Sequence, residues 1–421
     1  MALRILHTSD WHLGRSLYGQ KRYEEFDALL DWMINTLQTQ HVDVLLIAGD
    51  VFDSGTPSNR AMQQYYRFLT RVSGTHCRHV VIIGGNHDSP TFLNAPRELL
   101  KVLNVHVVGA KADNVEDEVI VLRNADQRAE AIICATPYLR DRDIRSTEAG
   151  ESIEDKAQKL LDGIQAHYAA VTAHAEALHA ALPSEDAAHV PIIAMGHLFT
   201  AGGRTTDGDG VRDLYVGSIA HVGANIFPPA LDYVALGHLH VPQNVGGRGH
   251  IRYSGSPIAM GFGEALKQKS VCLMTFDQRK PELTLIDIPV FQRLRQLRGN
   301  LQRLQSDLQH LVQDNISTWV EVMYTGDDIV PDLREQLDYA VSSDNTNQQS
   351  PVTILRIKNQ RSSAQLSSGE APQQTLDDLT PQDVFEKCLD ANKVASEQRP
   401  ALQLAWQEIL QQLQEHDTRA E

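Results

Sequence analysis

The sequence has no long hydrophobic run and no secretion signal. Among its 421 residues, the longest apolar runs, such as residues 44–48 and 80–83, are far shorter than the ~20 residues that a membrane-spanning helix needs. The first residues also lack the apolar region and the small-residue cleavage site of a signal peptide. We therefore expect a soluble, cytoplasmic protein with no membrane association.

Cysteine, ATP-binding motifs and positive charge are also scarce. The four cysteines lie far apart without a C-x-x-C pair, which excludes a zinc knuckle and fits a reducing compartment. No G-x-x-x-x-G-K-[ST] motif occurs, so we expect no ATP site in this chain. The formal net charge of −16 argues against nucleic-acid binding through a globally basic surface. A local basic groove, or a metal site that supplies positive charge, stays compatible with it.

The composition that is present is that of a globular protein, with 42% hydrophobic and 22% charged residues. Up to about residue 290, short β-branched runs alternate with helical patterns. The expected strands are residues 3–7, 42–47, 79–83, 105–108, 131–135, 191–195, 233–236, 251–253, 270–276 and 283–288. The expected helices are residues 23–39, 58–72, 91–103 and 153–182. This alternation favours an α/β fold with helices on the faces of a sheet.

Beyond residue 290 the pattern changes. We expect a helix at 294–312, a strand at 319–324, a helix at 332–341 and a strand at 352–357, which together form a small α+β unit. A polar, Ser/Gln-rich segment precedes two further helices, at 381–391 and 396–414. We therefore divide the chain into a main domain (1–290), a second domain (291–361), a linker (362–375) and C-terminal helices (376–421).

Five of the expected strands are followed directly by residue types that bind metals. In chain order, these segments are Asp10-Trp11-His12, Gly49-Asp50, Gly85-Asn86-His87-Asp88, Gly196-His197 and Gly237-His238-Leu239-His240. In open α/β sheets, ligands bind at the carboxyl ends of strands, so segments far apart in the chain can converge there. Each segment alone is more often a turn. The five together indicate one metal site.

Seven of these side chains are enough to hold two cations that share a bridging carboxylate. They are Asp10, His12, Asp50, Asn86, His197, His238 and His240. Two metals about 3.5–4 Å apart can bind a phosphate, acidify a bridging water and stabilise both the attacking and the leaving oxygen. Four imidazoles favour Mn, Fe or Zn over Mg, which prefers oxygen ligands.

His87 is the candidate catalytic residue. It follows Asn86 directly, so its side chain should project in a different direction, and Asp88 beside it could orient the ring. A histidine near its working pKa can protonate a leaving alkoxide, which is worth roughly 10²–10⁴-fold in rate. The alternatives are a further metal ligand or the N-terminal cap of a helix.

The motif order D-x-H, G-D, G-N-H-D, G-H, G-H-x-H resembles the signature of the calcineurin-like metallophosphoesterases. This resemblance implies a sandwich of two sheets flanked by helices, with Asp50 bridging two metals and His87 catalytic. The remaining ligands would be Asp10, His12 and His240 for one metal, and Asn86, His197 and His238 for the other.

Residues between the motifs are similar to those of one branch, the bacterial SbcD family of exonuclease subunits. The similarity lies in segments 7–14 (HTSDWHLG), 48–53 (AGDVFD), 137–144 (PYLRDRDI) and 253–257 (YSGSP). Some archaeal and eukaryotic relatives carry histidine where this sequence has Asp53, which leaves the role of that position open.

The SbcD resemblance implies hydrolysis of DNA phosphodiesters with two Mn²⁺ or other divalent cations. The implied activities are 3′→5′ exonuclease action on double-stranded DNA ends and endonuclease action on single strands and hairpins, in DNA repair, recombination and replication. An SbcC-like SMC-family ATPase is the implied partner, and a homodimer within a heterotetramer the implied assembly. The second domain would be a cap that positions DNA. The alternatives are a phosphatase or small-molecule phosphodiesterase, and a non-catalytic scaffold that would not need the ligand set.

Basic and aromatic residues give less specific signals. The candidate DNA contacts are Arg15, Lys21, Arg22, Arg140 and Arg142. Such residues would hold phosphates without reading sequence, although a solvated charged face explains them equally well. The aromatics Tyr65, Tyr66 and Phe68 suit either a dimer contact or the core.

The C-terminal helices carry apolar stripes. The first stripe contains Val384, Phe385, Cys388 and Leu389, and the second contains Leu402, Trp406, Ile409 and Leu413. A short helix pair with little core of its own must bury such stripes elsewhere. Docking onto the main domain is one solution; we favour a helix-in-groove contact with the ATPase.

Overall fold

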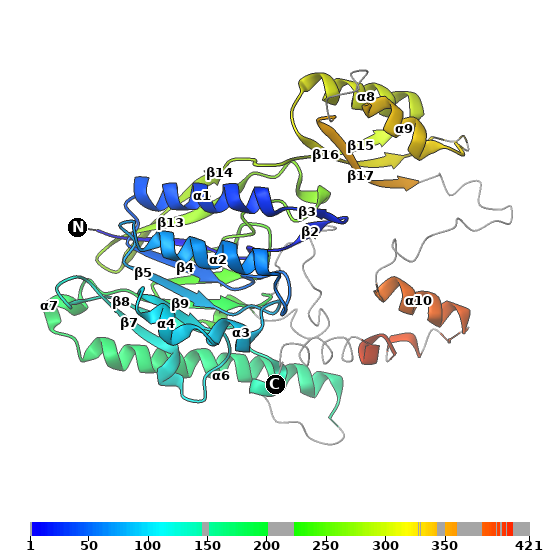
Figure 1. The fold of residues 1–421 in the computed structure, drawn as a ribbon. Helices are drawn as coiled ribbons and strands as arrows, with labels where there is room; N and C mark the ends of the chain where they lie inside the picture. The colour runs from blue at the N-terminus through cyan, green and yellow to red at the C-terminus, as the bar shows by residue number, and fades with distance from the viewer. Residues whose placement is uncertain are drawn as a thin grey trace.

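The computed structural model describes residues 2–144, 151–200, 223–326, 328, 330–342, 350–359, 381–392, 394–395, 398–400 and 402–406. Its main body contains two six-stranded sheets packed face to face, with helices on their outer faces (Figure 1). The expected α/β sandwich is therefore confirmed. Among the described residues, no helix is long and apolar enough to cross a membrane.

The first sheet has four parallel strands and an antiparallel pair at one edge. Its order is β14 (Lys280–Ile288), β13 (Lys269–Asp277), β1 (Leu3–Thr8), β4 (Val44–Ala48), β5 (His79–Ile83) and β6 (Val105–Val108). Strands β1, β4, β5 and β6 run parallel. Every residue of β4 is buried, because both faces of this central strand are covered.

The second sheet is mostly parallel with an antiparallel strand at each edge. Its order is β11 (Gln243–Val245), β12 (Arg248–Tyr253), β10 (Tyr233–Gly237), β9 (Ile192–His197), β8 (Ala129–Ala135) and β7 (Val119–Arg123). Strands β8, β9, β10 and β12 run parallel. The edge strands β7 and β11 were not predicted; each pairs with a neighbour along the chain.

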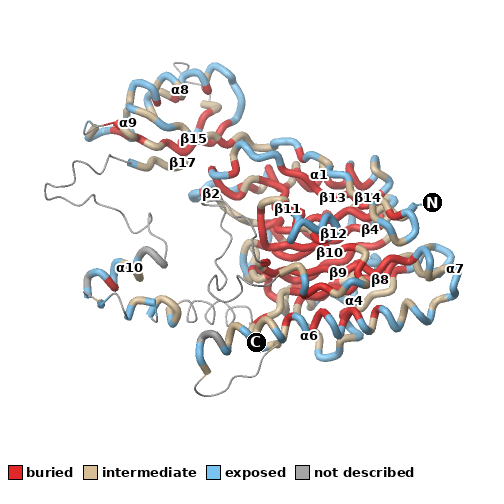
Figure 2. The backbone as a smooth tube through the Cα atoms, turned by 180° about the vertical axis from the view of Figure 1, so that it is seen from behind, coloured by how far each residue is buried: buried red, intermediate tan, exposed pale blue. Residues whose placement is uncertain are grey.

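Three cores hold the sandwich together. One lies between the sheets and contains Leu46, Ile83 and Met195. Helices α1 (Tyr23–Thr39) and α2 (Asn59–Val72) close a second core over the first sheet, and α6 (Ile153–Ala180) closes a third over the second sheet. Figure 2 shows the sheets buried and exposed residues along α1 and α6.

Short elements complete the main body. They are the hairpin β2 (Ser16–Leu17) and β3 (Gln20–Lys21), helices α3 (Pro90–Asn94), α4 (Arg97–Lys101), α5 (Asp141–Ile144) and α7 (Ser184–Ala187), and the 3-10 turns η1 (Val115–Glu118), η3 (Ala224–Ile226) and η4 (Phe262–Glu264). The single helix predicted at 91–103 is divided into α3 and α4. Proline at position 96 is the reason, because it has no N–H to donate to the preceding turn.

Residues after 290 form a three-stranded parallel sheet with two crossover helices. The strands are β15 (Arg293–Gly299), β16 (Thr318–Tyr324) and β17 (Val352–Asn359), and the helices are α8 (Leu301–Asp314) and α9 (Leu333–Val341). The core of this unit includes Leu308, Val322 and Leu337. A smaller cluster of Leu17, Phe262, Leu294 and Trp319 joins it to the main body.

The prediction of one helix at 294–312 was wrong. Residues 293–299 form β15, and α8 begins after Asn300, whose side chain caps it by accepting from the Arg303 N–H. The main-chain pairing of β15 with β16 decides this, and a local pattern cannot reveal such a pairing.

The C-terminal region is described in part. Helix α10 (Pro381–Ala391) has the predicted bounds. The linker 362–375 and most of the helix predicted at 396–414, including Ile409 and Leu413, lie outside the described residues. The domain boundaries at 290 and 361 stay predictions.

Candidate metal centre

The five predicted segments meet at one edge of the sandwich. They follow or end β1, β4 and β5 of the first sheet and β9 and β10 of the second. Main-chain hydrogen bonds join the first two segments: the Asp10 N–H donates to the Gly49 carbonyl (3.0 Å), and the His12 N–H donates to the Asp50 carbonyl (3.0 Å). The sheet topology thus brings together all seven side chains that the sequence singled out.

The backbone is strained at four of these positions. Asp10, His12, Asp50 and His238 have φ values of 54°, 50°, 49° and 104°. This left-handed region is unfavourable for residues with a Cβ, costs about 1–3 kcal/mol for each residue, and recurs at functional sites. These backbone conformations direct the four side chains toward the same centre.

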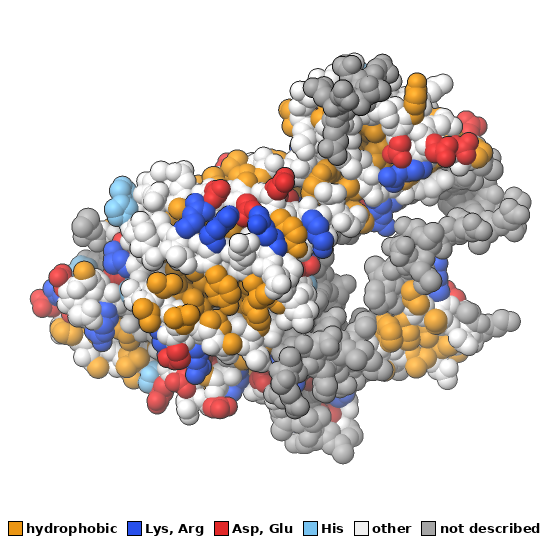
Figure 3. All heavy atoms as spheres, viewed as in Figure 1, with side chains coloured by type: hydrophobic (Ala, Val, Ile, Leu, Met, Phe, Trp, Pro, Cys, Tyr) orange, Lys and Arg blue, Asp and Glu red, His pale blue; other side chains and the backbone are white. Residues whose placement is uncertain are grey.

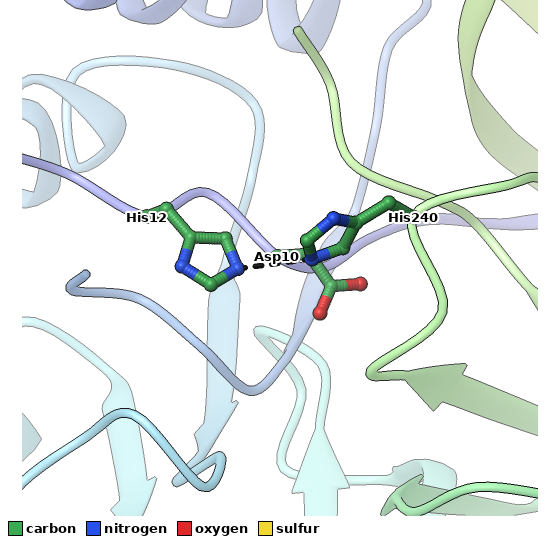
Figure 4. Close-up of side chains that lie close together, drawn as sticks. All are labelled: Asp10, His12 and His240. Atoms are coloured by element: carbon green, nitrogen blue, oxygen red, sulfur yellow. Dashed lines mark hydrogen bonds between the residues drawn. The ribbon is translucent and has the colours of Figure 1, made fainter. Parts of the chain in front are cut away.

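The first ligand cluster contains Asp10, His12 and His240. One ligand atom from each residue lies within 4.8 Å of the others. The His12 Nε2 and His240 Nε2 atoms are 3.1 Å apart (Figure 4). Ser9 Oγ donates to one oxygen of the Asp10 carboxylate, and the His238 main-chain N–H donates to the other (2.9 Å).

The second cluster contains Asp50, His197 and His238, which meet the same distance criterion. Asn86 joins them, because its Oδ1 lies 3.0 Å from both His197 Nε2 and His238 Nδ1. Asp50 Oδ2 is 3.3 Å from His197 Nε2 and 3.6 Å from His12 Nε2, so one carboxylate oxygen faces both clusters.

Electrostatic effects set the charge of these groups. Burial and the neighbouring His197 lower the pKa of His238 to about 3, and burial with His12 holds the pKa of His240 well below its usual value. Burial opposes ionisation of His197, but the Asp50 and Asp10 carboxylates outweigh it and raise its pKa to about 9. His238 and His240 are therefore neutral imidazoles, the form that can bind a metal.

The residues present fit divalent metal ions. The donor set combines two carboxylates, an amide oxygen and four imidazoles, which suits first-row transition metals. His238 Nε2 is buried without a hydrogen-bond partner among the described residues. The backbone of Gly85 approaches so closely that a Cβ there would lie 2.2 Å from Asp50 Oδ1. The centre is thus dense with metal-binding atoms.

The His87 main-chain N–H donates to Asp50 Oδ1 (2.8 Å), and its ring nitrogen Nδ1 is 2.8 Å from the Asp53 carbonyl, to which it donates. The expectation that Asp88 orients the His87 ring was wrong, because the Asp88 carboxylate accepts from three main-chain N–H groups and thereby ties two loops together. The helix-cap alternative is excluded, since Ser89 caps α3.

Asp53 contacts His12 of the first cluster. Its Oδ1 is 3.2 Å from His12 Nδ1 and 3.3 Å from Arg15 Nη1. Burial opposes the charge, but these partners lower the pKa of Asp53 to about 2. Asp53 is therefore an ionised carboxylate in contact with the His12 ring. A third group of close side chains, His12, Asp53 and His87, leaves a metal-ligand role for His87 open.

The segment 253–257, which the sequence marked only through family resemblance, contacts the two loops that carry His197 and Asp10. The Tyr253 hydroxyl donates to the Leu198 carbonyl (2.6 Å), next to His197. The Ser254 hydroxyl is 2.8 Å from Ser9 Oγ, which holds Asp10. Sequence reasoning missed these positioning roles, and the repeated serines around Gly255 were the available signal.

The candidate DNA contacts have different surroundings. Arg22 is only 1% exposed and is bonded to Glu25 through two nitrogens (2.7 and 3.0 Å), so it is unsuited to DNA contact. Arg140 is 8% exposed. Arg15 is partly exposed, and Lys21 on β3 and Arg142 on α5 are exposed. Of the five candidates, only these last three present surface to a duplex.

The aromatic residues of α2 are mainly core residues. Tyr65 and Phe68 are each 1% exposed in the core under α1 and α2, and Tyr66 packs at its margin. The core interpretation is therefore correct for two of the three.

Comparison with known proteins gives consistent results. The family model described as "Calcineurin-like phosphoesterase" matches residues 3–242, and one described as "Type 5 capsule protein repressor C-terminal domain" matches residues 290–393. The chain is 36% identical over 404 residues to the SbcD component of the nuclease SbcCD from Escherichia coli (strain K12), covering 95% of this chain and 96% of that protein. It is 37% identical over 281 residues to the protein of the same name from Rhodobacter capsulatus, and 34% identical over 273 residues to that from Bacillus subtilis. Each of these two matches covers 65% of this chain and 66% of the relative.

Proposed function

This chain belongs to the calcineurin-like phosphoesterases and, within them, to the SbcD nuclease family, and on that basis we propose that it cuts DNA phosphodiesters as the nuclease subunit of an SbcCD-type complex. It is a metal-dependent hydrolase. The observation that carries the proposal is the pair of ligand clusters that face one oxygen of Asp50.

Two divalent cations, most simply Mn²⁺, are the proposed cofactors. One would be held by Asp10, His12 and His240, the other by Asn86, His197 and His238, with Asp50 shared between them. When bound, such a pair of cations supplies an acidified water and positive charge for both oxygens of the reacting phosphodiester.

The protein's own groups orient the ligands and supply a proton. His87 is the proposed general acid. Its Nδ1 proton is engaged by the Asp53 carbonyl, so proton delivery to the leaving oxygen falls to Nε2. Asp53 keeps the His12 ring in place, and Asn86 adds a neutral oxygen that leaves net positive charge at the loaded site.

The proposed reactions are 3′→5′ exonuclease action on double-stranded ends and endonuclease action on single strands and hairpins, in repair, recombination and replication. Arg15, Lys21 and Arg142 would hold the DNA backbone without reading its sequence. A phosphatase or small-molecule phosphodiesterase with the same centre is the competing proposal.

One experiment separates the two enzymes. Purified chain is incubated with Mn²⁺, a labelled linear duplex and a chromogenic phosphate monoester, beside an Asp50→Asn variant that lacks the shared carboxylate charge. We expect the wild-type chain to shorten the duplex and the variant to leave it intact. Hydrolysis of the monoester alone would contradict the nuclease proposal.

An SbcC-like SMC-family ATPase is the proposed partner of the C-terminal helices. Phe385 of α10 stacks on Trp406 with ring centroids 4.8 Å apart, and Leu389 is 4% exposed, so the two segments pair with one another. Val384 and Leu402 are 37% and 41% exposed, which leaves apolar surface on the pair for a partner groove.

A homodimer is the proposed assembly of the main body. Figure 3 shows hydrophobic side chains gathered over the face where α2 and α4 lie. Leu99 and Val102 are 72% and 80% exposed, and large exposed apolar patches mark protein–protein contacts. Sedimentation of the purified chain tests this, and a monomer at micromolar concentration would contradict it.

A further inference from the structure

A buried lysine contacts the main chain of His240, a residue of the first ligand cluster. Lys269, the first residue of β13, is only 6% exposed. Its Nζ donates to Ser256 Oγ (2.9 Å), Glu264 Oε2 (3.0 Å) and the main-chain carbonyl of His240 (3.2 Å). An ammonium group has three protons to donate, and its burial is costly unless it is paired and hydrogen-bonded. These partners meet that requirement.

The His240 carbonyl is held by a second donor as well. The Ser256 main-chain N–H donates to the same oxygen (3.2 Å). The turn that brings Ser256 there needs Gly255, which has φ +76° and where a Cβ would lie 2.8 Å from the His240 oxygen. Two donors, Lys269 Nζ and the Ser256 N–H, therefore fix the main chain that carries the His240 imidazole.

The third partner, Glu264, connects this network with the small sheet. It is fully buried on η4, and its Oε2 also accepts from the Met260 N–H (2.8 Å). Phe262 at the start of the same turn packs with Leu294 of β15 and Trp319 of β16. The ion pair thus lies between the ligand cluster and the contact with the second unit.

We propose that Lys269 is a positioning residue that fixes the main chain of His240, so that its imidazole meets Asp10 and His12. Lys269 does not itself belong to the ligand clusters. The inference rests on the proposed function in that it takes His240 as a metal ligand. Groups that orient metal ligands typically contribute roughly 10–100-fold to metal affinity.

The test uses a double variant of the full chain, Lys269→Met with Glu264→Gln. Methionine removes the three donors while keeping an unbranched side chain, and glutamine avoids an unpaired buried carboxylate while it can still accept from the Met260 N–H. Lys267→Met is the matched control, because Lys267 is an exposed lysine two residues earlier. His240→Ala serves as the reference for loss of the ligand itself.

Metal-stripped proteins are titrated calorimetrically with Mn²⁺, and their free energies of unfolding are measured in urea without metal. We expect the double variant to bind Mn²⁺ about 10–100-fold more weakly at one of two sites, with the other site near wild type. Lys267→Met should match wild type at both sites. Ser256→Ala, which removes one hydroxyl acceptor, should weaken the same site by a smaller factor.

Wild-type affinity at both sites in the double variant would overturn the inference. Equal weakening of both sites with a large loss of unfolding free energy would also overturn it, because Lys269 would then only stabilise the fold. If the double variant does not fold, Ser256→Ala decides: unchanged affinity refutes the inference, and selective weakening supports it. Two intact sites in His240→Ala would instead refute the proposed ligand set.

Discussion

At the residue scale, neighbours give chemically identical side chains different charges. The His197 and His238 rings lie 5.3 Å apart between centroids, yet their pKa values move in opposite directions, to about 9 and about 3. His197 faces the Asp50 carboxylate, whereas His238 faces His197 itself. A metal ion therefore has to displace a proton from His197 but not from His238, and metal binding is coupled to pH.

Replacement of His87 by alanine should preserve metal binding and abolish cleavage. The ring is tied to the Asp53 carbonyl and lies outside both three-residue clusters assigned to the metals. Loss of a general acid costs roughly 10²–10⁴-fold in rate. Mn²⁺ titration and duplex degradation under saturating Mn²⁺ measure the two properties separately. A variant that loses one Mn²⁺ site would make His87 a ligand.

His106, on the edge strand β6, makes the stability of the fold depend on pH. Burial and the neighbouring His79 lower the pKa of His106 to about 4 in the folded protein. In the unfolded chain the pKa of His106 has its ordinary value near 6.5. Below that pH the unfolded chain therefore binds a proton at His106, whereas the folded chain does not until the pH approaches 4. Stability is therefore lost as the pH falls from about 6.5 toward 4.

His106→Gln should remove this loss. Between pH 7 and pH 5, the free energy of unfolding of wild type should fall by about 2 kcal/mol more than that of the variant. Urea denaturation of both metal-free proteins at the two pH values measures the difference. A difference between the proteins that does not change with pH would show that His106 titrates normally in the folded state.

At the element scale, the ligand loops depend on how closely the two sheets approach. Gly237 ends β10, and a Cβ on this residue would lie 1.9 Å from the Ala48 carbonyl at the end of β4. Real Cβ atoms do not come so close to a main-chain oxygen. Glycine is needed here because β10 and β4 carry His238 and Asp50 into the same centre.

Gly237→Ala should therefore separate the strand ends. We expect a loss of roughly 1–3 kcal/mol of unfolding free energy, as for overpacking of a core, together with weaker Mn²⁺ binding. Gly249→Ala on β12 is the control, because nothing lies within 4 Å of its added Cβ, and it should change stability by less than about 0.5 kcal/mol. Urea unfolding and Mn²⁺ titration measure both effects; equal stability of the two variants would contradict the close approach.

At the scale of the whole molecule, the metal centre exists only where the two sheets meet. The first sheet carries Asp10, His12, Asp50 and Asn86, and the second carries His197, His238 and His240. Neither sheet has a complete ligand set. Folding of the sandwich and assembly of the site are therefore one event, and bound metal should stabilise the whole main body.

The C-terminal segment should be separable from this activity. α10 pairs with residues 402–406 through the Phe385–Trp406 stack and carries none of the proposed ligands. Deletion of residues 376–421 should abolish co-purification with an SMC-family ATPase and leave Mn²⁺-dependent cleavage of a simple duplex largely intact. Pull-down yield and duplex degradation are the measurements. A truncated chain that captures the partner at wild-type yield would contradict the assignment.

The local sequence by itself determined the elements and the ligand types. Helices at 23–39 and 381–391 have the predicted bounds, because apolar periodicity and end signals act within a few residues. The convergence of the seven proposed ligands was predictable for a similar reason, since each lies at the end of a strand or a few residues beyond it. Chain order and residue type sufficed, together with the rule that parallel strands present their carboxyl ends at one edge.

Only the tertiary structure decided which partner each side chain meets. Residues 293–299 form a strand because β16 lies beside them, Arg22 is buried against Glu25, and His87 is held by the Asp53 carbonyl rather than by Asp88. Lys269 reaches the His240 carbonyl across 29 positions of the chain. These contacts depend on main-chain positions set by sheet packing, and the free energy of a buried charge depends on the partners that packing supplies. No local pattern contains that information.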